Sequence, residues 1–166
     1  MKSKLQKKQE IEQGNALATD AQSLVFVDFS KTPVKQVTQL KNSARALGAT
    51  YRVIKKRLLK RVFTEKDITV DPEQFNGQVA TIFSPGDISE IGGVVYRFIK
   101  GLDKDTSFQM LGGYAAETKK FFSQEDMTRI GQLPSREVLL AQLMGMLQAP
   151  MRQLAYTLDQ VARKKK

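Results

Sequence analysis

The most regular hydrophobic pattern in the chain lies at its C-terminal end, between Leu133 and Lys166. Large apolar residues recur there at steps of three and four positions, which on a helix places them along one continuous stripe. The pattern predicts a helix from residue 136 to about residue 164 whose apolar side needs a partner. The stripe consists of Leu140, Leu143, Met144, Leu147, Met151, Leu154, Leu158 and Val161.

A short pattern repeats within this stretch. Gln142-Leu143-x-x-x-Leu147 returns eleven residues later as Gln153-Leu154-x-x-x-Leu158. Eleven residues make about three helical turns, so both copies face nearly the same way, about 16 Å apart along the axis. Pro150 lies between them, and a proline inside a helix removes a backbone hydrogen bond and bends the axis. We therefore expect two similar docking sites in tandem, each on its own segment.

The same stripe also fits an ordinary C-terminal helix that folds back onto its own domain. Length argues against that alternative, because the predicted helix would be about 40 Å long, which exceeds the diameter of a domain of this size. A long protruding helix is therefore expected. The helix is not expected to bind phosphate, because its charges before Arg163 are balanced: they are Arg136, Glu137, Arg152 and Asp159.

Upstream of this helix, short β-favouring apolar segments alternate with segments of helical period. Strands are predicted over residues 24–29, 50–55, 79–84 and 107–111, the last ending at Gly112-Gly113. Helices are predicted over residues 2–18, 33–47 with Thr32 as cap, 56–63, 88–100, 117–122 and 125–130. A further cap, Ser135, would start the C-terminal helix. The order predicts an α+β domain of four short strands packed with helices.

Composition narrows the chemistry. The 166 residues include no cysteine and no histidine, which excludes disulfides, the usual zinc sites and Ser-His-Asp or Cys-His catalysis. No apolar run approaches the roughly 18 residues that span a bilayer, and the first residues lack the apolar core of a signal peptide. We expect a cytoplasmic, non-enzymatic protein with no cofactor, metal, membrane contact or small-molecule substrate.

The net charge of +10 is concentrated in one segment. Eleven basic residues and a single acid, Glu65, lie between Lys31 and Lys66. A solvated surface usually mixes both signs, whereas a one-sided run is typical of a protein that binds a phosphate backbone. Acidic lipid is the competing partner, but the apolar residues interleaved here have the spacing of core-facing residues.

The predicted helix over residues 56–63 is amphipathic, with Leu58, Leu59, Val62 and Phe63 on its inner face. Four cations would then share its outer face, and the first predicted helix adds a basic first turn, which is the wrong sign for a helix N-terminus unless anions neutralise it. The residues expected to bind RNA are Lys2, Lys4, Lys7, Lys8, Lys55, Lys56, Arg57, Lys60 and Arg61.

Two motifs together resemble one known family. They are Arg52-Val53-Ile54-Lys55-Lys56-Arg57-Leu58-Leu59-Lys60-Arg61 and Leu133-Pro134-Ser135-Arg136-Glu137-x-Leu139-Leu140-Ala141-Gln142-Leu143. In this order and separation they closely resemble the family of the bacterial ribosomal stalk-base protein, large-subunit ribosomal protein number ten. The resemblance runs end to end and includes Val27-Asp28-Phe29 and Leu111-Gly112-Gly113.

The resemblance implies a fold and a set of partners. The fold is a ferredoxin-like α/β plait over residues 1–131, which sits on large-subunit rRNA beside ribosomal protein number eleven. Residues 132–166 form the helical arm, which in that family binds dimers of the acidic stalk protein, number seven/twelve, that recruit translational GTPases. The repeat described above leads us to expect two such dimers.

Two positions depart from the usual family pattern. The family usually has asparagine where this chain has Lys56, which puts in doubt any single hydrogen bond transferred to that position. It usually has glycine where this chain has Lys31, so the loop before Pro33 is expected to differ in shape.

Two other functions fit parts of the sequence. A metal-dependent nuclease or RNA-processing enzyme would need gathered carboxylates, and the nearest pairs, Asp87 with Glu90 and Asp103 with Asp105, sit at the ends of predicted elements. A free RNA chaperone or regulator would share the basic surface but would have no stalk partner. Stable co-purification of acidic dimers would distinguish it from a stalk-base protein.

Overall fold

The structure is a computed structural model that describes residues 4–66, 68, 70–75, 77–102, 107–134 and 136–164. The chain divides into two units, residues 1–133 and residues 134–166. The first unit contains α1 (Lys4–Asp20), β1 (Ser23–Asp28), α2 (Val34–Ala46), β2 (Thr50–Arg52), α3 (Lys56–Glu65), η1 (Pro72–Gln74), β3 (Val79–Ser84), α4 (Ile88–Lys100), β4 (Gln109–Ala115), β5 (Lys120–Phe122) and α5 (Gln124–Gln132). The second contains α6 (Arg136–Lys164).

A single antiparallel sheet organises the first unit, with strand order β2-β3-β1-β4-β5. β1 lies between β3 and β4, and Val25 pairs with Ile82 on one side and with Gly113 on the other. The chain order β1-α2-β2-β3-α4-β4 with spatial order β4-β1-β3-β2 is that of the ferredoxin-like plait. The predicted α+β fold is therefore confirmed, with one strand more than the four expected.

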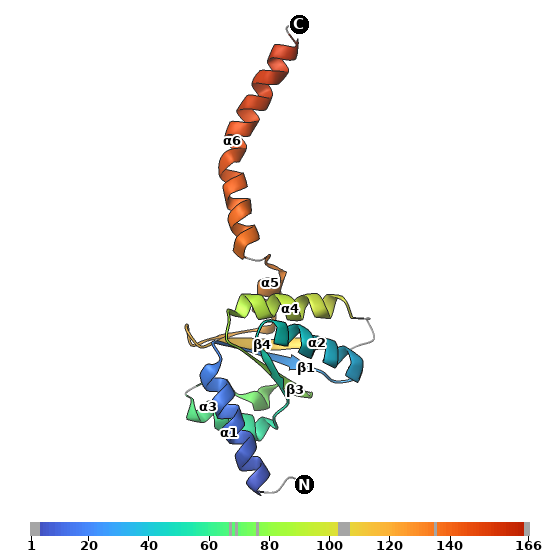
Figure 1. Cartoon of the computed structure of the whole chain (residues 1–166), viewed down its shortest axis with the longest axis vertical. Coiled ribbons are helices and arrows are strands. Elements are labelled where there is room, and N and C mark those ends of the chain that lie inside the picture. The colour runs from blue at the N-terminus through green and yellow to red at the C-terminus, as the bar shows by residue number, and fades with distance from the viewer. Residues whose placement is uncertain are drawn as a thin grey trace. The chain divides into compact units, whose positions relative to one another are not determined.

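Helices cover both faces of the sheet, and nearly all residues of β1 and β3 are therefore buried. Most of these residues are apolar. Val25 and Val27 face the cluster that contains Leu40 of α2 and Val95 of α4. Phe26 points to the opposite face, where α1 and α3 supply the cover. Figure 1 shows α2 and α4 on one side of the sheet and α1 and α3 on the other. Helices adjacent in sequence, α2 and α3, thus lie on opposite faces.

The region after β4 departs from the sequence prediction. The helix predicted over residues 117–122 is wrong, because β5 occupies Lys120–Phe122 and β4 continues through the glycine pair to Ala115. Gly112 lies beside a β-bulge at φ +159°, where an added Cβ would lie 2.7 Å from the Phe121 ring. The glycines do not end the strand; they let the β5 aromatic ring and α5 approach it closely.

Smaller differences concern element ends. The second strand ends at Arg52 rather than at residue 55, and α2 starts after Pro33, not after a Thr32 cap. The Thr32 hydroxyl instead donates to the Ser30 carbonyl oxygen. Lys31 adopts a left-handed φ of +57°, the backbone region that favours glycine. The predicted acidic pair Asp103 and Asp105 and the predicted cap Ser135 lie outside the described residues.

Three of the glycines inside helices, Gly14, Gly92 and Gly131, mark close packing. Gly14 of α1 faces α3: a Cβ there would lie 3.1 Å from Val62. Gly92 of α4 lies under α5, where Gly131 approaches its carbonyl oxygen and the Tyr96 side chain. Gly93 has open space around its Cα, so only the first residue of the Gly92-Gly93 pair serves the helix contact. The cost of glycine in a helix is thus offset by burial of neighbouring apolar groups.

Candidate nucleic-acid interface and partner-binding helix

The amphipathic pattern of α3 is realised as predicted. Leu58, Leu59, Val62 and Phe63 are buried against the sheet, and Phe63 meets the Phe26 ring edge-on at 5.8 Å. The helix therefore cannot rotate without exposing its apolar side. Of its outward cations, Arg57, Lys60 and Arg61 are exposed and Lys56 is half-buried.

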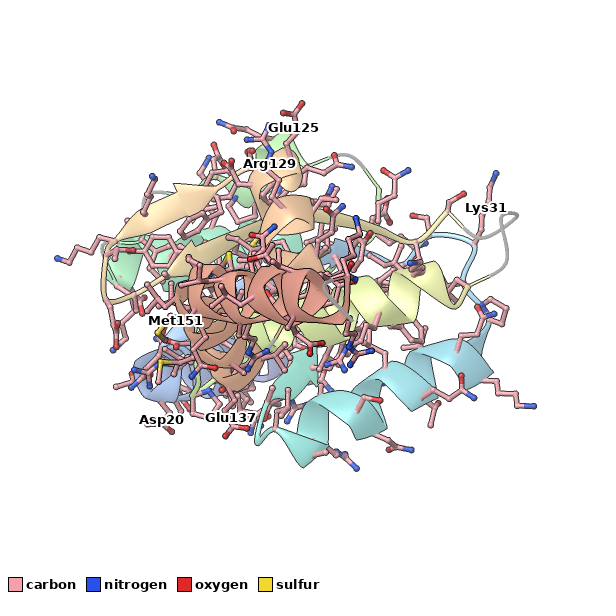
Figure 2. The ribbon with its side chains drawn as sticks, turned by 90° about the horizontal axis from the view of Figure 1, so that it is seen from above. Asp20, Lys31, Glu125, Arg129, Glu137 and Met151 are labelled. Carbon is pink, nitrogen blue, oxygen red and sulfur yellow. The ribbon has the colours of Figure 1, made fainter. Side chains whose placement is uncertain are left out.

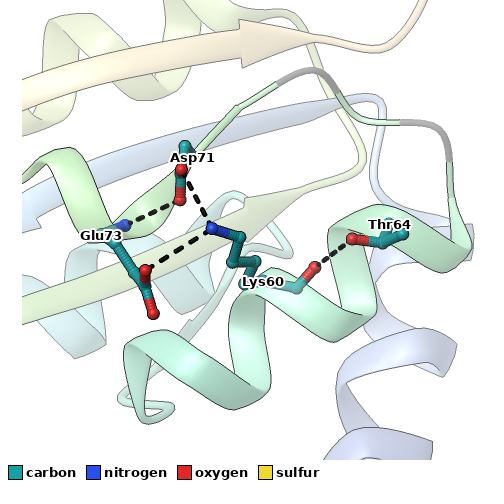
Figure 3. Close-up of polar contacts among 4 residues, drawn as sticks. All are labelled: Lys60, Thr64, Asp71 and Glu73. Atoms are coloured by element: carbon teal, nitrogen blue, oxygen red, sulfur yellow. Dashed lines mark hydrogen bonds and ion pairs between the residues drawn. The ribbon is translucent and has the colours of Figure 1, made fainter.

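These four cations differ in whether a group of the same chain binds them, a result that the sequence did not predict. Lys60 Nζ lies 3.1 Å from Asp71 Oδ2 and 3.5 Å from Glu73 Oε2 (Figure 3). Lys56 Nζ donates a 2.5 Å hydrogen bond to the Phe75 carbonyl oxygen. Lys56 and Lys60, one turn apart, are thus both held by the segment that contains η1. Among the described residues, Arg57 and Arg61 form no ion pair.

The pair of Lys60 and Asp71 shifts the titration of both groups. The hydrogen bond from Lys60 lowers the pKa of the Asp71 carboxyl, and the same contact raises the pKa of the Lys60 ammonium. Asp71 also accepts from the Glu73 backbone N–H at 3.2 Å, which fixes its carboxylate at the start of η1. At neutral pH both groups are charged, so part of the α3 charge is balanced within the chain.

Cations of α1 lie on the same side of the sheet as α3. Lys7 and Lys8 are exposed, and the Asn15 side-chain amide donates a 2.6 Å hydrogen bond to the Glu65 carboxylate where α1 packs on α3. Lys2 lies outside the described residues, and the Lys4 side chain is not described. The described candidates of α1 and α3 thus belong to two helices that cover the same side of the sheet (Figure 1).

Other cations of the basic run lie on the opposite face. Lys35 and Arg45 are exposed on α2, and Lys31 points away from the ribbon in the loop before it (Figure 2). Lys41 lies over the Tyr51 ring at 5.2 Å, and burial raises the pKa of Tyr51 to about 12. One continuous run in the sequence therefore supplies two separate basic surfaces. This division of the cations follows from the packing of α2 and α3 on opposite faces of the sheet.

The second unit is a single helix of 29 residues, about 43 Å long, with no buried side chain among its described residues. The eight stripe residues are each between 50% and 68% exposed. The sequence reasoning did not include four further exposed apolar residues, Val138, Leu139, Met146 and Tyr156, because they fall outside the stripe. The helix is continuous through Pro150 and bends near its middle (Figure 1).

Comparison with known proteins assigns the family. The sequence profile described as Ribosomal protein L10 matches residues 2–100, and the profile of the Ribosomal protein uL10 C-terminal region matches residues 133–166. The large ribosomal subunit protein uL10 of Shouchella clausii (strain KSM-K16) is 32% identical over 161 residues, which cover 96% of this chain and 93% of that protein. The chain belongs to the ribosomal protein L10 family.

Other family members align over comparable lengths. The uL10 protein of Dehalococcoides mccartyi (strain BAV1) is 32% identical over 149 residues, 90% of this chain and 82% of the relative. That of Psychrobacter sp. (strain PRwf-1) is 29% identical over 157 residues, 94% of this chain and 86% of the relative. The ribosomal protein L10 family is a structural, non-enzymatic family of the large ribosomal subunit, so this chain is a ribosomal protein of the cytoplasm.

The alternative of a metal-dependent enzyme has no support in the part of the chain that the structure describes. No three acidic side chains gather there as metal ligands. Asp87 is the N-cap residue of α4 and Glu90 lies in the first turn of that helix. Both residues thus sit at the end of an element, as the sequence predicted. No described helix is long and apolar enough to cross a membrane.

Proposed function

We propose that this protein forms the base of the large-subunit lateral stalk. In this proposal, residues 1–131 bind large-subunit rRNA beside ribosomal protein number eleven. Residues 132–166 anchor two dimers of the acidic stalk protein, number seven/twelve, which recruit translational GTPases. The observation that carries the proposal is the exposed apolar stripe of α6, in a chain whose other unit has exposed cations on α3.

Arg57 and Arg61 support RNA binding because their side chains are exposed and form no ion pair among the described residues. An arginine in this state presents its whole donor fork to a phosphate. Lys55 precedes them at the N-cap of α3, and Lys7 and Lys8 add charge from α1 on the same side of the sheet. A phosphate backbone is the partner that neutralises several such cations at once.

The apolar stripe of α6 supports a helix-binding partner. Each of its large side chains is worth roughly 1.5 to 3 kcal/mol when fully buried, so a few per site outweigh the cost of association. The Gln-Leu-x-x-x-Leu motif occurs twice in this helix, with one copy on either side of Pro150. Two copies of one docking motif are the basis for proposing two dimers.

The decisive experiment is reconstitution. The full chain, produced together with the acidic stalk protein from the same cells, is expected to give a complex of one copy with two dimers in native mass spectrometry. The purified complex should then bind deproteinised large-subunit rRNA, with an affinity that falls steeply as salt rises. A chain that binds rRNA but retains no acidic partner would instead be a free RNA-binding protein.

Removing the acidic charges of Asp71 and Glu73 beside α3 is expected to raise the affinity for rRNA, whereas removing a cation is expected to lower it. Replacing Asp71 by asparagine and Glu73 by glutamine frees Lys60 for a phosphate, because both of its described ion-pair partners lose their charge. We expect tighter rRNA binding and a salt slope steeper by about 0.7 to 0.9, the contribution of one additional phosphate contact. Filter-binding titrations between low and moderate salt would measure both.

The matched control for this variant carries the same charge change away from α3, with Asp87 replaced by asparagine and Glu125 by glutamine, both of which are exposed. If both double variants steepen the slope equally, the effect is one of net charge and Lys60 has no special position. An unchanged slope in the Asp71 and Glu73 variant would mean that Lys60 does not reach phosphate even when free.

A further inference from the structure

Phe121 provides an exposed aromatic ring on the side of the sheet that α3 covers. It is the one phenylalanine among the described residues that is exposed, at 38%, and it belongs to β5, an edge strand of the sheet. Its cross-strand partner on β4 is Tyr114, which is buried in the cluster beneath α1 and α3. The Phe121 ring therefore lies on the same side of the sheet as the cations of α3.

The Phe121 ring is held in place from beneath and from one side. Gly112 of β4 leaves the space that the ring occupies, since a Cβ there would lie 2.7 Å from Phe121 Cζ. The Phe75 ring lies beside it, tilted by 33° with ring centroids 6.3 Å apart, and Phe75 in turn packs on buried Phe26 at 5.4 Å. A ring fixed in this way loses little conformational entropy when a ligand stacks on its free surface.

A cation contacts the neighbouring residue of this aromatic pair. The Lys56 ammonium group donates a hydrogen bond to the carbonyl oxygen of Phe75, whose ring lies beside Phe121, and an ammonium group has three donors in all. Lys119, in the β4–β5 turn, is exposed two residues before Phe121, whereas Lys120 of β5 lies over the Phe122 ring at 5.7 Å, on the opposite face of the strand. A single exposed phenylalanine ring differs from the broad apolar patch that a protein partner buries.

We propose that Phe121 is a stacking platform for an unpaired base of the bound RNA, with Lys56 contacting a neighbouring phosphate. This inference rests on the proposed binding of rRNA. An exposed aromatic ring beside cations is how proteins hold splayed-out bases of loops and bulges, because every base offers a π face. A regular duplex offers no free base face, so the RNA site contains a nucleotide outside the helical stack.

The chain contains no tryptophan, which makes the test direct. In the Phe121→Trp variant the indole is the only one in the protein, and we expect its fluorescence to be quenched when deproteinised large-subunit rRNA binds. The matched control is Leu47→Trp, since Leu47 is 37% exposed and lies at the end of α2, on the other face of the sheet. Its indole should keep its fluorescence at the same RNA occupancy.

Affinity gives a second readout. Phe121→Leu keeps an apolar side chain but removes the π face, and we expect binding about 5- to 100-fold weaker, with Phe121→Tyr restoring it. An unquenched indole at position 121 on a chain that binds rRNA with a steep salt dependence would overturn the stacking inference and leave the proposed function intact. Failure of the unmodified chain to bind rRNA would overturn the proposed function itself.

Discussion

Replacing Lys55, Arg57 and Arg61 together by glutamine is expected to weaken rRNA binding roughly 100- to 500-fold at about 0.1 M salt and to reduce the salt slope by about 2 to 3. Each phosphate that a cation neutralises adds roughly 0.7 to 0.9 to that slope, and the logarithm of affinity at 0.1 M falls by a similar amount for each cation removed. The three side chains are exposed and form no ion pair among the described residues. The free energy of unfolding should therefore change by less than about 0.5 kcal/mol.

Lys56 and Lys60 are left out of this variant for a structural reason. Lys60 holds Asp71 and Glu73, and Lys56 holds the Phe75 carbonyl oxygen, so removing either would disturb η1 as well as the charge. A loss of binding would then have two explanations. The chosen set separates phosphate contact from the conformation of the segment beside α3.

The domain offers a control of equal charge on its opposite face. Lys31, Lys35 and Arg45 are exposed in and before α2, so their replacement by glutamine removes the same three charges. Long-range attraction predicts similar losses for both variants, whereas direct contact through α3 predicts a much larger loss for the first. Fluorescence anisotropy with labelled rRNA across a salt series distinguishes the two; a larger loss in the α2 variant would move the RNA site to the other face.

The elements that sequence reasoning locates well are those whose periodicity is long or whose composition is unambiguous. The helix predicted from residue 136 to about 164 is found at Arg136–Lys164, and β3 and α4 have the predicted bounds. In each, the apolar pattern reflects the surface that the element itself buries or exposes. Local sequence therefore carries the information.

β5 could not be found in this way. It has only three residues, Lys120–Phe122, and Gly112 on β4 leaves the space for its Phe121 ring and its Phe122 carbonyl oxygen. A strand this short acquires its stability from its neighbour, and the apolar pair Phe121-Phe122 fits a helix equally well. Sequence reasoning consequently missed Phe121 as a candidate, although an aromatic residue next to Lys119 and Lys120 was a visible signal.

The division of the basic run was equally hidden. Charge counting shows how many cations lie between Lys31 and Lys66, but the side of the sheet on which each lies depends on the plait topology. The pairing of Lys60 with acids 11 and 13 residues further along depends on how the η1 segment folds back. Both are tertiary facts, which a pattern in one segment does not contain.

Truncation after Pro150 is expected to reduce the acidic partner on α6 from two dimers to one, while rRNA binding stays nearly unchanged. The truncated helix keeps Leu140, Leu143 and Leu147, which include the first copy of the motif, and lacks Leu154 and Leu158 of the second. The two copies are about 16 Å apart along the helix, which separates one dimer from the next. Native mass spectrometry counts the dimers directly.

A substitution gives the same result without shortening the chain. Leu154→Asp with Leu158→Asp should also leave one dimer, because both side chains are more than 60% exposed in the free helix and would bury an unpaired charge on docking, at a cost of several kcal/mol. Tyr156→Asp is the matched control. Tyr156 is equally exposed, but at about 100° per residue it lies on the opposite side of the helix from Leu154 and Leu158.

The outcomes discriminate between two arrangements of the arm. If each segment of α6 carries its own dimer, the control binds two dimers and both the truncated and the doubly substituted chains bind one. If a single dimer grips the helix across the bend at Pro150, truncation removes all partner, because that dimer is deprived of half its apolar surface. Three dimers on the intact chain would contradict the two-copy argument, since the Gln-Leu-x-x-x-Leu motif occurs only at Gln142 and Gln153 in the sequence of this helix.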